Sequence, residues 1–389
     1  MSRSRIAGLL WRQQGRWWLA MIGLLWSIPL WAAVIGQDDR IQVSDSNRFP
    51  FRTVGLIETD DSTCTATLIG PRHILTAAHC LVDLQGQSRW KRNPYFTPGH
   101  QGIGSQAYGP QLIVRAWLEK DYLAAAAAMS ELQPLAMGEA QPAALNIFVS
   151  QTMMLDYAVA ELDQPIGDKS GWLGLQQVGL AAPFVQIGGY PIDKGRYWQW
   201  FALCQTKPAD QGPWLQRCDL SPGMSGAAAL VRDYEDSYAA IGIYAAGSPQ
   251  HNYLIPITAA LQQRLLDWRQ GKADAATVTT EFKHDPGYSL RLANHCGRSV
   301  HAVVHYRDSR GNWVTSNWQE TPARQWRQLA RSSSPTFYIY AEAVGQDGPR
   351  WEGQDLQKRV GNSKRLYGLT KVVIQDPRPR PYIHNIRCQ

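Results

Sequence analysis

Short apolar runs separated by turn residues recur along most of this chain, and they restrict what it can fold into. The sequence holds 33 Gly and 23 Pro, together with 16 Trp and 16 Tyr. Hydrophobic residues make up 44% and charged residues only 18%, which is the composition of a folded protein. Because short runs with frequent turns build barrels or sandwiches rather than long helices, we predict a mainly β fold.

Individual elements can be predicted from these runs. Strands are expected at residues 51–58, 65–69, 73–77, 144–149, 156–162, 184–188, 197–204, 227–231 and 239–245. The stretch 84–110 is rich in Gly, Pro, Ser and Gln and predicts a loop, whereas 124–129 has the composition of a short surface helix. Apolar residues at approximately helical spacing over 256–269 predict a helix that closes this part of the chain.

The length of 389 residues exceeds what one hydrophobic core usually organises, so we predict more than one domain. A first β-rich domain is expected over residues 38–270, followed by a linker of mostly small residues over 271–284. A small β-rich domain is expected over 285–389, with strands at 300–306, 313–317 and 337–343.

Charge divides the chain in the same way. Residues 34–274 carry 18 basic and 23 acidic side chains, net −5, whereas 275–389 carry 17 basic and 9 acidic ones, net +8. The basic part would favour an anionic surface such as an envelope polymer, although ordinary solvated charge explains the same counts. Nucleic acid is not an expected partner, because no nucleic-acid motif is recognisable.

The first residues have the pattern of an export signal. Four arginines precede an uncharged run over residues 17–36: Arg3, Arg5, Arg12 and Arg16. Small residues, Ala32 and Ala33, lie near the end of that run, which favours a signal peptide over residues 1–33 that is cleaved near Ala33. About 20 apolar residues can also just span a bilayer, so an uncleaved membrane anchor remains the alternative. We expect a secreted or periplasmic protein, with the membrane as a partner only if the segment is uncleaved.

Six cysteines, an even number, fit an oxidising compartment. Sequence does not determine their connectivity, but pairing within domains suggests three disulfides: Cys64 with Cys80, Cys204 with Cys218, and Cys296 with Cys388. No C-x-x-C spacing of a zinc site is present.

Three separate motifs supply the groups that nucleophilic catalysis requires. The sequence TAAHC places His79 after an apolar run, DYAV begins at Asp156, and the glycine-rich SPGMSGA contains Ser225. Hydrolysis of an amide needs a nucleophile, a base, a group that orients the base, and donors for the developing oxyanion. Each residue alone is more often structural, but their joint occurrence predicts a Ser, His and Asp catalytic triad.

The order His79, Asp156, Ser225 and the surrounding sequences resemble the trypsin and chymotrypsin clan of serine proteases. More narrowly, they are similar to the bacterial branch that includes the glutamyl endopeptidases. Three further segments match that branch: Asp38-Asp39-Arg40, Phe96-Thr97-Pro98-Gly99 and Gly189-Tyr190-Pro191. The similarity covers roughly residues 38–270. It implies a double six-stranded β-barrel with a closing helix, and endopeptidase activity on polypeptide substrates.

By this resemblance Ser225 attacks the scissile carbonyl and forms an acyl-enzyme, His79 transfers the proton, and Asp156 orients His79. The backbone amides of Gly223 and Ser225 would form the oxyanion hole. This chemistry needs no cofactor or metal. A catalytically idle protease fold, serving as an envelope binding or scaffold protein, is the alternative function.

The sequence differs from the families that it resembles at positions that bear on activation and on substrate specificity. Met224 stands where digestive relatives carry an Asp that pairs with a new amino terminus, so that activation switch is not expected. Tyr244, followed by Ala245 in the expected substrate pocket, stands where glutamate-cutting relatives usually carry a His. Asp219 has the offset of the pocket Asp in enzymes that cut after Arg or Lys, although it could instead bond to backbone.

The last domain weakly resembles a small bacterial β-domain family of unknown function, through NHC at 294–296, AVVHY at 302–306 and YIYA at 338–341. Four of its tryptophans could form a ligand-binding platform or could simply pack: Trp313, Trp318, Trp326 and Trp351. We hypothesise that this domain tethers the protein to an envelope polymer or protein partner. His301 and His305 could share a strand face, but two histidines without a third ligand do not predict a metal site.

Overall fold

The structure is a computed structural model in which most of the chain after residue 33 is described. The described residues are 34–83, 89–102, 107–125, 151–179, 182–195, 197–209, 212–232, 235, 237–248, 250–345, 347–376 and 381–388. The expected signal segment 1–33 and the expected strand 144–149 lie outside them. Of the expected helix 124–129, residues 124 and 125 are helical and the remainder lies outside the described residues.

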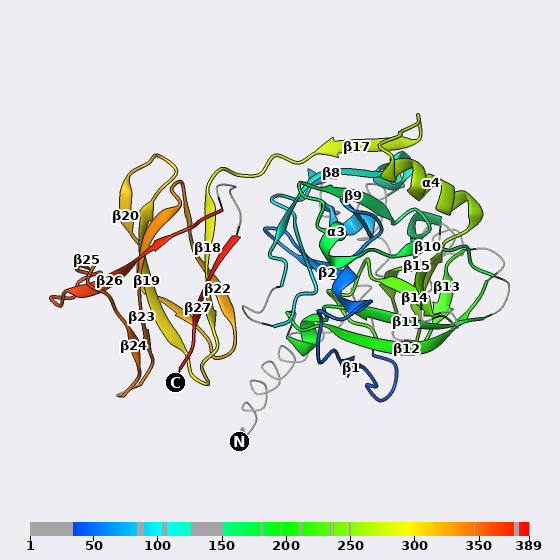
Figure 1. Cartoon of the computed structure of the whole chain (residues 1–389). Helices are drawn as coiled ribbons and strands as arrows, with labels where there is room; N and C mark the ends of the chain where they lie inside the picture. The colour runs from blue at the N-terminus through cyan, green and yellow to red at the C-terminus, as the bar shows by residue number, and fades with distance from the viewer. Residues whose placement is uncertain are drawn as a thin grey trace, which may run out of the picture.

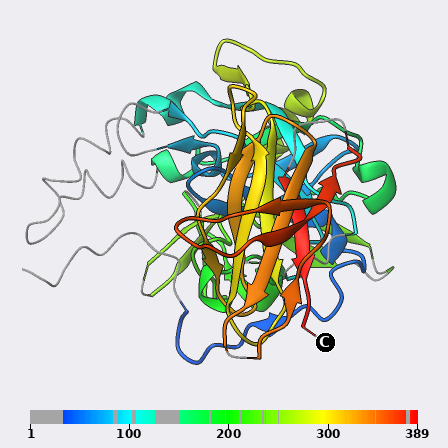
Figure 2. The ribbon, with the colours of Figure 1, turned by 90° about the vertical axis from the view of Figure 1, so that its left-hand side faces the viewer.

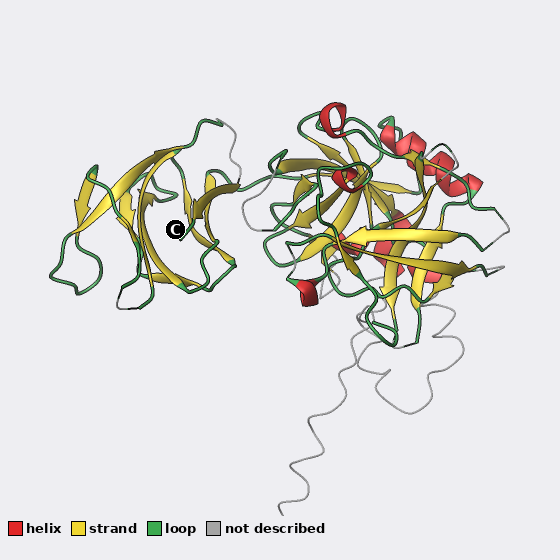
Figure 3. Ribbon diagram, turned by 60° about the horizontal axis from the view of Figure 1, so that its bottom comes forward, coloured by secondary structure: helices red, strands yellow, loops and turns green. Residues whose placement is uncertain are grey.

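The fold is mainly β, with few helices (Figure 3), as predicted. Two closed six-stranded barrels lie side by side and are followed by a separate β domain at the C-terminal end of the chain (Figure 1). We call residues up to 281 the two-barrel domain and the rest the C-terminal domain. When the molecule is turned by 90°, the C-terminal domain, coloured yellow to red, lies in front of the barrels (Figure 2).

The first barrel runs in the order β8-β7-β2-β3-β4-β9 and is closed by pairing of β8 with β9. Its strands are β2 (Val54–Glu58), β3 (Thr63–Leu68), β4 (His73–Thr76), β7 (Tyr95–Pro98), β8 (Gln111–Glu119) and β9 (Ala158–Leu162). Its core is built from inward-facing residues such as Ile57, Leu68 and Phe96, each fully buried. A short hairpin of β5 (Val82–Asp83) and β6 (Arg89–Trp90) lies beside it.

One sequence prediction in this barrel is wrong. Residues 84–110 were expected to be loop, but β7 lies within them and pairs with both β2 and β8. The turn-forming residues around Tyr95–Pro98 hid it, because a strand of four residues flanked by Gly and Pro has almost no period of its own. Pairing on both sides, a tertiary effect, stabilises it.

The second barrel runs in the order β12-β11-β14-β15-β16-β13 and is closed by pairing of β12 with β13. Its strands are β11 (Phe184–Gly189), β12 (Trp200–Lys207), β13 (Trp214–Gln216), β14 (Ala228–Arg232), β15 (Tyr238–Gly247) and β16 (Asn252–Pro256). Two short strands extend its sheet, β1 (Ile41–Gln42) along β12 and β10 (Gly174–Leu175) along β15. The short helical turns are η1 (Phe51–Thr53), η2 (Ala78–Cys80), α3 (Gly167–Ser170) and η3 (Ile192–Lys194).

Helix α4 (Ala259–Arg269) closes the two-barrel domain, as the apolar spacing predicted. It begins at the N-cap Thr258, whose hydroxyl accepts a hydrogen bond from the amide of Leu261 at 3.2 Å. Its buried face, including Leu265 and Trp268, packs into the core that joins the two barrels.

The segment expected to be a linker does not run free. Within 271–284 the chain forms β17 (Thr277–Glu281), which pairs antiparallel with β8 from Thr277 opposite Glu119 to Glu281 opposite Arg115. The small and β-branched residues of this segment fit a linker or an edge strand equally well by composition. The segment forms a strand because it pairs with the edge of β8.

The C-terminal domain consists of two antiparallel-rich sheets around its own core. One has the order β22-β18-β27, and the other β20-β19-β23-β26-β25 with β21 and β24 added at β19 and β23. The strands are β18 (Tyr288–Asn294), β19 (Val300–Arg307), β20 (Trp313–Thr315), β21 (Gln319–Thr321), β22 (Trp326–Ser332), β23 (Thr336–Ala343), β24 (Arg350–Trp351), β25 (Leu356–Lys358), β26 (Tyr367–Val373) and β27 (Pro381–Ile386). Leu292, Val304 and Phe337 are central to the core.

All three disulfides have the pairing suggested by the sequence. Cys64 is joined to Cys80 in the first barrel, Cys204 to Cys218 in the second, and Cys296 to Cys388 in the C-terminal domain. None of the six cysteines is free. Chains with this pattern are typical of oxidising compartments.

Candidate active site

His79 lies in η2, directly after β4 of the first barrel, and its ring is held by Asp156. The Nδ1 atom of His79 is 2.7 Å from Oδ2 of Asp156, and the amide of His79 donates to Oδ1 of Asp156 at 2.9 Å. Both carboxylate oxygens therefore bind the same residue, which fixes the position of the imidazole and favours a proton on Nδ1. The His79 side chain is 24% exposed and that of Asp156 only 10%.

A tyrosine that the sequence did not single out supports Asp156. Tyr122 is buried, and its burial together with the charge and hydrogen bonding of Asp156 raises the pKa of the phenol well above its usual value. Tyr122 thus stays a neutral hydrogen-bond donor next to the carboxylate. It follows β8 in sequence, and no motif around it could have shown the contact.

Ser225 lies in the turn between residues 221 and 226 that leads into β14, and this turn packs on the His79 segment. Gly226 has φ +82°, and a Cβ there would lie 2.2 Å from Oγ1 of Thr76 and 2.7 Å from the amide nitrogen of Ala77. Only glycine permits that approach. The carbonyl oxygen of Ser225 is also 3.5 Å from Sγ of Cys80. The structure therefore brings Ser225 and His79 to neighbouring segments across the junction of the barrels.

Thr65 of β3 binds both ends of the serine turn. Its hydroxyl donates to the carbonyl of Gly223 at 2.8 Å, and its amide donates to the carbonyl of Ser225 at 2.9 Å. Thr65 is fully buried. These two bonds belong to a strand of the first barrel, so they fix the turn relative to the barrel that carries His79.

Two peptide groups of the turn have a defined orientation. The carbonyl of Pro222 accepts from the amide of Ile192 at 2.8 Å, and the carbonyl of Met224 accepts from the amide of Ala227 at 3.0 Å. In a trans peptide the N–H points opposite to the C=O, so the amides of Gly223 and Ser225 point away from these partners. Within the described part of the chain, neither amide donates a backbone hydrogen bond.

Glycine is required at position 223 for two reasons. Its φ is +96°, which side chains rarely adopt, and a Cβ would lie 2.3 Å from the carbonyl oxygen of Tyr190. The turn is therefore closely packed on the chain around Tyr190, which is itself fully buried.

The expected pocket residues are all buried. Asp219 is 2% exposed, and its two carboxylate oxygens accept hydrogen bonds from the amides of Ile35, at 2.6 Å, and Asp39, at 2.9 Å. This is the backbone role that the sequence left open for Asp219. Tyr244 is fully buried and its hydroxyl donates to Oδ1 of Asn252 at 3.3 Å, while Ala245 is 3% exposed.

Met224 is fully buried in the core of the second barrel. A thioether there cannot form an ion pair with an amino terminus, and the expected lack of that activation switch stays a prediction. The polar anchor nearby is Arg40, which contacts Asp38, Asp193 and Ser221. In the sequence Arg40 is noticeable only as part of the segment Asp38-Asp39-Arg40.

A family model described as Trypsin matches residues 40–101. The glutamyl endopeptidase of Bacillus licheniformis is 28% identical over 170 residues, 43% of this chain and 45% of that protein. Serine protease 23 of Homo sapiens is 25% identical over 268 residues, covering 61% of this chain and 64% of the relative. A solved Glu endopeptidase structure in complex with MPD matches with a TM-score of 0.50 and 23% identity, over 62% of this chain and 100% of its own.

The solved structure shows the fold: the two-barrel domain has the trypsin-like fold. Its sequence is similar to that of a glutamyl endopeptidase. The chain spans less than two thirds of the length of either curated relative named above. The three disulfides are consistent with an extracellular location.

The described residues bring together one group of possible metal ligands. Cys64, His79 and Cys80 bring possible ligand atoms within 4.8 Å of one another, but both sulfurs belong to one disulfide and cannot act as thiolate ligands. In the C-terminal domain His305 bonds to Oγ1 of Thr315, and His301 lies 3.7 Å from Glu320. The structure does not bring those two histidines to a common ligand.

The four tryptophans of the C-terminal domain do not form one platform. Trp326 packs at a tilt against Tyr197 of the trypsin-like domain, Trp351 packs on the core of its own domain, and Trp318 contacts Tyr340. Trp313 is the most exposed of the four, at 39%. Among the described residues, no helix is both long and apolar enough to cross a bilayer.

Proposed function

We propose that the protein is an exported serine endopeptidase in which Ser225 is the nucleophile, His79 the general base and acid, and Asp156 the group that orients His79. The observation that carries this proposal is the double contact of Asp156 with the ring and amide of His79, at 2.7 and 2.9 Å. A structural histidine needs one hydrogen bond, whereas a catalytic imidazole needs a fixed tautomer and direction.

In the proposed reaction His79 Nε2 removes the proton of Ser225 Oγ as Oγ attacks the carbonyl carbon of the scissile bond. The carboxylate of Asp156 stabilises the imidazolium that results. His79 then delivers this proton to the leaving amine, which departs and leaves an acyl-enzyme on Ser225. Water attacks the ester in the second half of the cycle, with His79 again as base, and restores free Ser225.

The oxyanion of both tetrahedral intermediates would bind the amides of Gly223 and Ser225. Support comes from the bonds at the carbonyls of Pro222 and Met224, which orient these two N–H groups away from their own turn. Such preorganised donors cost no rearrangement when charge develops, and the loss of one typically lowers the rate by about 100- to 1000-fold.

In this proposal Asp219 does not select the substrate residue before the cleaved bond, because main-chain amides bind both of its carboxylate oxygens. Buried Tyr244 likewise offers no cation to a substrate carboxylate. The C-terminal domain, with its basic net charge, is proposed to tether the enzyme to an envelope polymer or a protein partner.

The decisive experiment is labelling of the full chain with a fluorophosphonate probe, which reacts with activated serines. We expect covalent modification of the wild-type protein at Ser225 and none in Ser225→Ala. A second variant, His79→Gln, should label at least about 1000-fold more slowly because the base is lost. Equal labelling of wild type and Ser225→Ala, or no labelling of the folded wild type, would refute the enzymatic assignment and favour an idle scaffold.

A further inference from the structure

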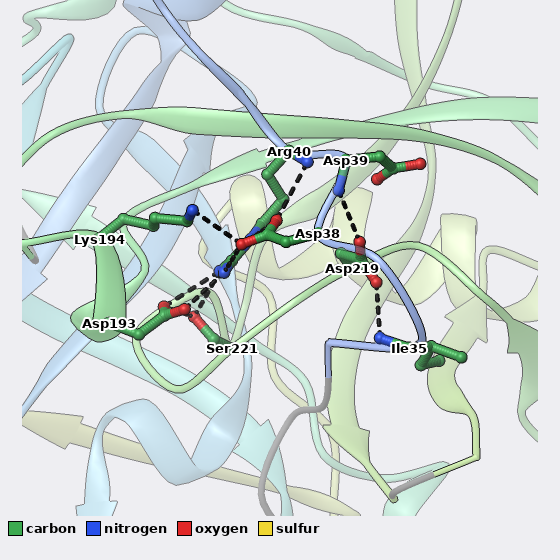
Figure 4. A network of polar contacts seen from close by, with 8 residues as sticks. All are labelled: Ile35, Asp38, Asp39, Arg40, Asp193, Lys194, Asp219 and Ser221. Carbon is green, nitrogen blue, oxygen red and sulfur yellow. Dashed lines mark hydrogen bonds and ion pairs between the residues drawn. The ribbon is translucent and has the colours of Figure 1, made fainter.

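Arg40 places a buried cation beneath the serine turn. Its side chain has no exposed surface. Its guanidinium donates to Asp38 at 2.8 Å, to Asp193 at 2.5 and 3.1 Å, and to the hydroxyl of Ser221 at 2.9 Å (Figure 4). A charge removed from water in this way is tolerated only when its donors are paired, and here carboxylates bind it from two sides.

The pairing holds the surrounding carboxylates ionised. Hydrogen bonds from Arg40 are the main reason why the pKa of Asp38 lies well below its usual value. Burial opposes ionisation of Asp193, but hydrogen bonds from Arg40 and Ser221 outweigh it and lower the pKa of Asp193. The network therefore stays charged through the neutral range.

The partners of Arg40 flank the peptide that presents the Gly223 amide. Ser221, which also donates to Asp193, directly precedes Pro222. Asp193 directly follows Ile192, whose amide donates to the carbonyl of Pro222 at 2.8 Å. Arg40 thus binds Asp193 and Ser221, the chain neighbours of Ile192 and Pro222. It therefore lies on both sides of the hydrogen bond between those two residues. That bond determines which way the N–H of Gly223 points.

The N-terminal segment that carries Arg40 is anchored independently. The two oxygens of Asp219 accept from the amides of Ile35 and Asp39, and Nζ of Lys194 lies 2.8 Å from Asp38 (Figure 4). Asp219 and Lys194 belong to the same two segments, 219–222 and 192–194, that Arg40 joins. Residues 35–40 therefore connect the segments 219–222 and 192–194 to each other.

We propose that Arg40 is a positioning residue for the oxyanion hole, holding the Pro222–Gly223 peptide in its productive orientation. A carboxylate at position 224 could hold this peptide by forming an ion pair with an amino terminus. Arg40, a residue within the chain, holds the peptide instead. The buried Met224 rules out that pairing here. The inference rests on the proposed function for its catalytic consequence, but the orientation of the peptide can be measured without catalysis.

The test compares Arg40→Met with Arg52→Met in the full chain. Arg52 is a matched control, since its partly buried guanidinium donates to the carbonyl of Ser170 at 2.7 Å, away from residues 219–226. We expect Arg40→Met to lower kcat on a peptide substrate about 100-fold, as loss of an oxyanion donor does, with KM changed less than about threefold. Arg52→Met should stay within about threefold of wild type in both constants.

A chemical rescue separates positioning from general structural damage. Guanidinium ions added to Arg40→Ala should restore at least about tenfold of the lost kcat, because a free guanidinium can occupy the space between Asp38 and Asp193. Folding is checked by circular dichroism and a cooperative thermal transition. If Arg40→Met does not fold, Asp193→Asn replaces it, since this isosteric change removes the charge that Arg40 binds while keeping the amide of Ile192.

Hydrogen exchange at the amide of Ile192 provides the readout that is independent of activity. It should lose protection in Arg40→Met and keep it in Arg52→Met. Unchanged protection and a kcat within threefold of wild type in folded Arg40→Met would overturn the inference. A wild type that fails to label with fluorophosphonate would refute the proposed function instead, and the exchange result would still decide whether Arg40 orients the peptide.

Discussion

Replacing Arg291 by Met should destabilise the protein by about 3 kcal/mol, because it leaves Glu58 as a buried, unpaired carboxylate. Nη1 of Arg291, in β18 of the C-terminal domain, donates to both oxygens of Glu58, in β2 of the first barrel, at 3.0 Å. The side chains are only 9% and 7% exposed. Met keeps an apolar side chain against the ring of Trp326, over which the guanidinium lies at 4.4 Å, so the substitution removes the charge pairing with Glu58 and the weaker cation–π attraction to that ring.

Urea unfolding at pH 7, followed by circular dichroism, measures the change. The double variant Glu58→Gln/Arg291→Met removes both charges and should recover most of the loss, which completes a double-mutant cycle. Arg92→Met is the control on the same face, since Arg92 pairs with Asp285 at 2.8 Å but its side chain is 70% exposed, and its effect should be much smaller. Equal losses in the single and double variants, or a single-variant loss below about 1 kcal/mol, would refute the reasoning.

Three further outcomes are expected. Removing the disulfide with Cys64→Ala/Cys80→Ala should cost about 3 kcal/mol in thermal unfolding, given a sequence separation of 16, and an unchanged transition would contradict this. Burial, then the charges of Arg269 and Arg72, lower the pKa of His73 from 6.5 to about 4. Its neutral form therefore stabilises the fold above pH 6.5, and this stabilisation is lost as the pH falls toward 4. His73→Gln should therefore lose less stability than wild type between pH 7 and pH 4 in urea titrations, and parallel losses would argue against it. A peptide-library digest should show no preference for Arg or Lys, and Asp219→Asn should leave the cleavage pattern unchanged; a strong Arg preference abolished by Asp219→Asn would reverse that view.

The fold class and eight of the twelve barrel strands could be predicted from the sequence, because short apolar runs bounded by turn residues record local preferences. The strands β8, β13 and β16 were not among those expected. The strand β7 and the strand β17 could not be predicted, since each is stabilised by pairing with a neighbour that is distant in sequence. The disulfide pairs followed from assigning cysteines to domains, and the structure has that pairing.

For the candidate site, the motifs around His79, Asp156 and Ser225 could be read directly, and their catalytic roles stay a proposal. The contacts of Arg40 with Asp193 and of Asp219 with Ile35 span 153 and 184 positions. Polar contacts of this kind leave no periodic pattern, because each requires one side chain of the correct charge and no repeat. A family offset pointed Asp219 toward a substrate, whereas the structure directs it to the backbone of the N-terminal segment.

The pairing of β17 with β8 also determines how mechanical load would pass through the molecule. The chain enters the C-terminal domain only after it has added a strand to the first barrel, and β8 in turn pairs with β9, which begins two residues after Asp156. Tension applied to the C-terminal domain, as on a protein held at a surface in flowing liquid, would therefore pass through the ladder between β17 and β8, together with the pair of Arg291 and Glu58. The strand β9, which follows the proposed catalytic Asp156, pairs with β8 in turn. The sheet that would carry the pulling force therefore also supports a residue of the proposed active site.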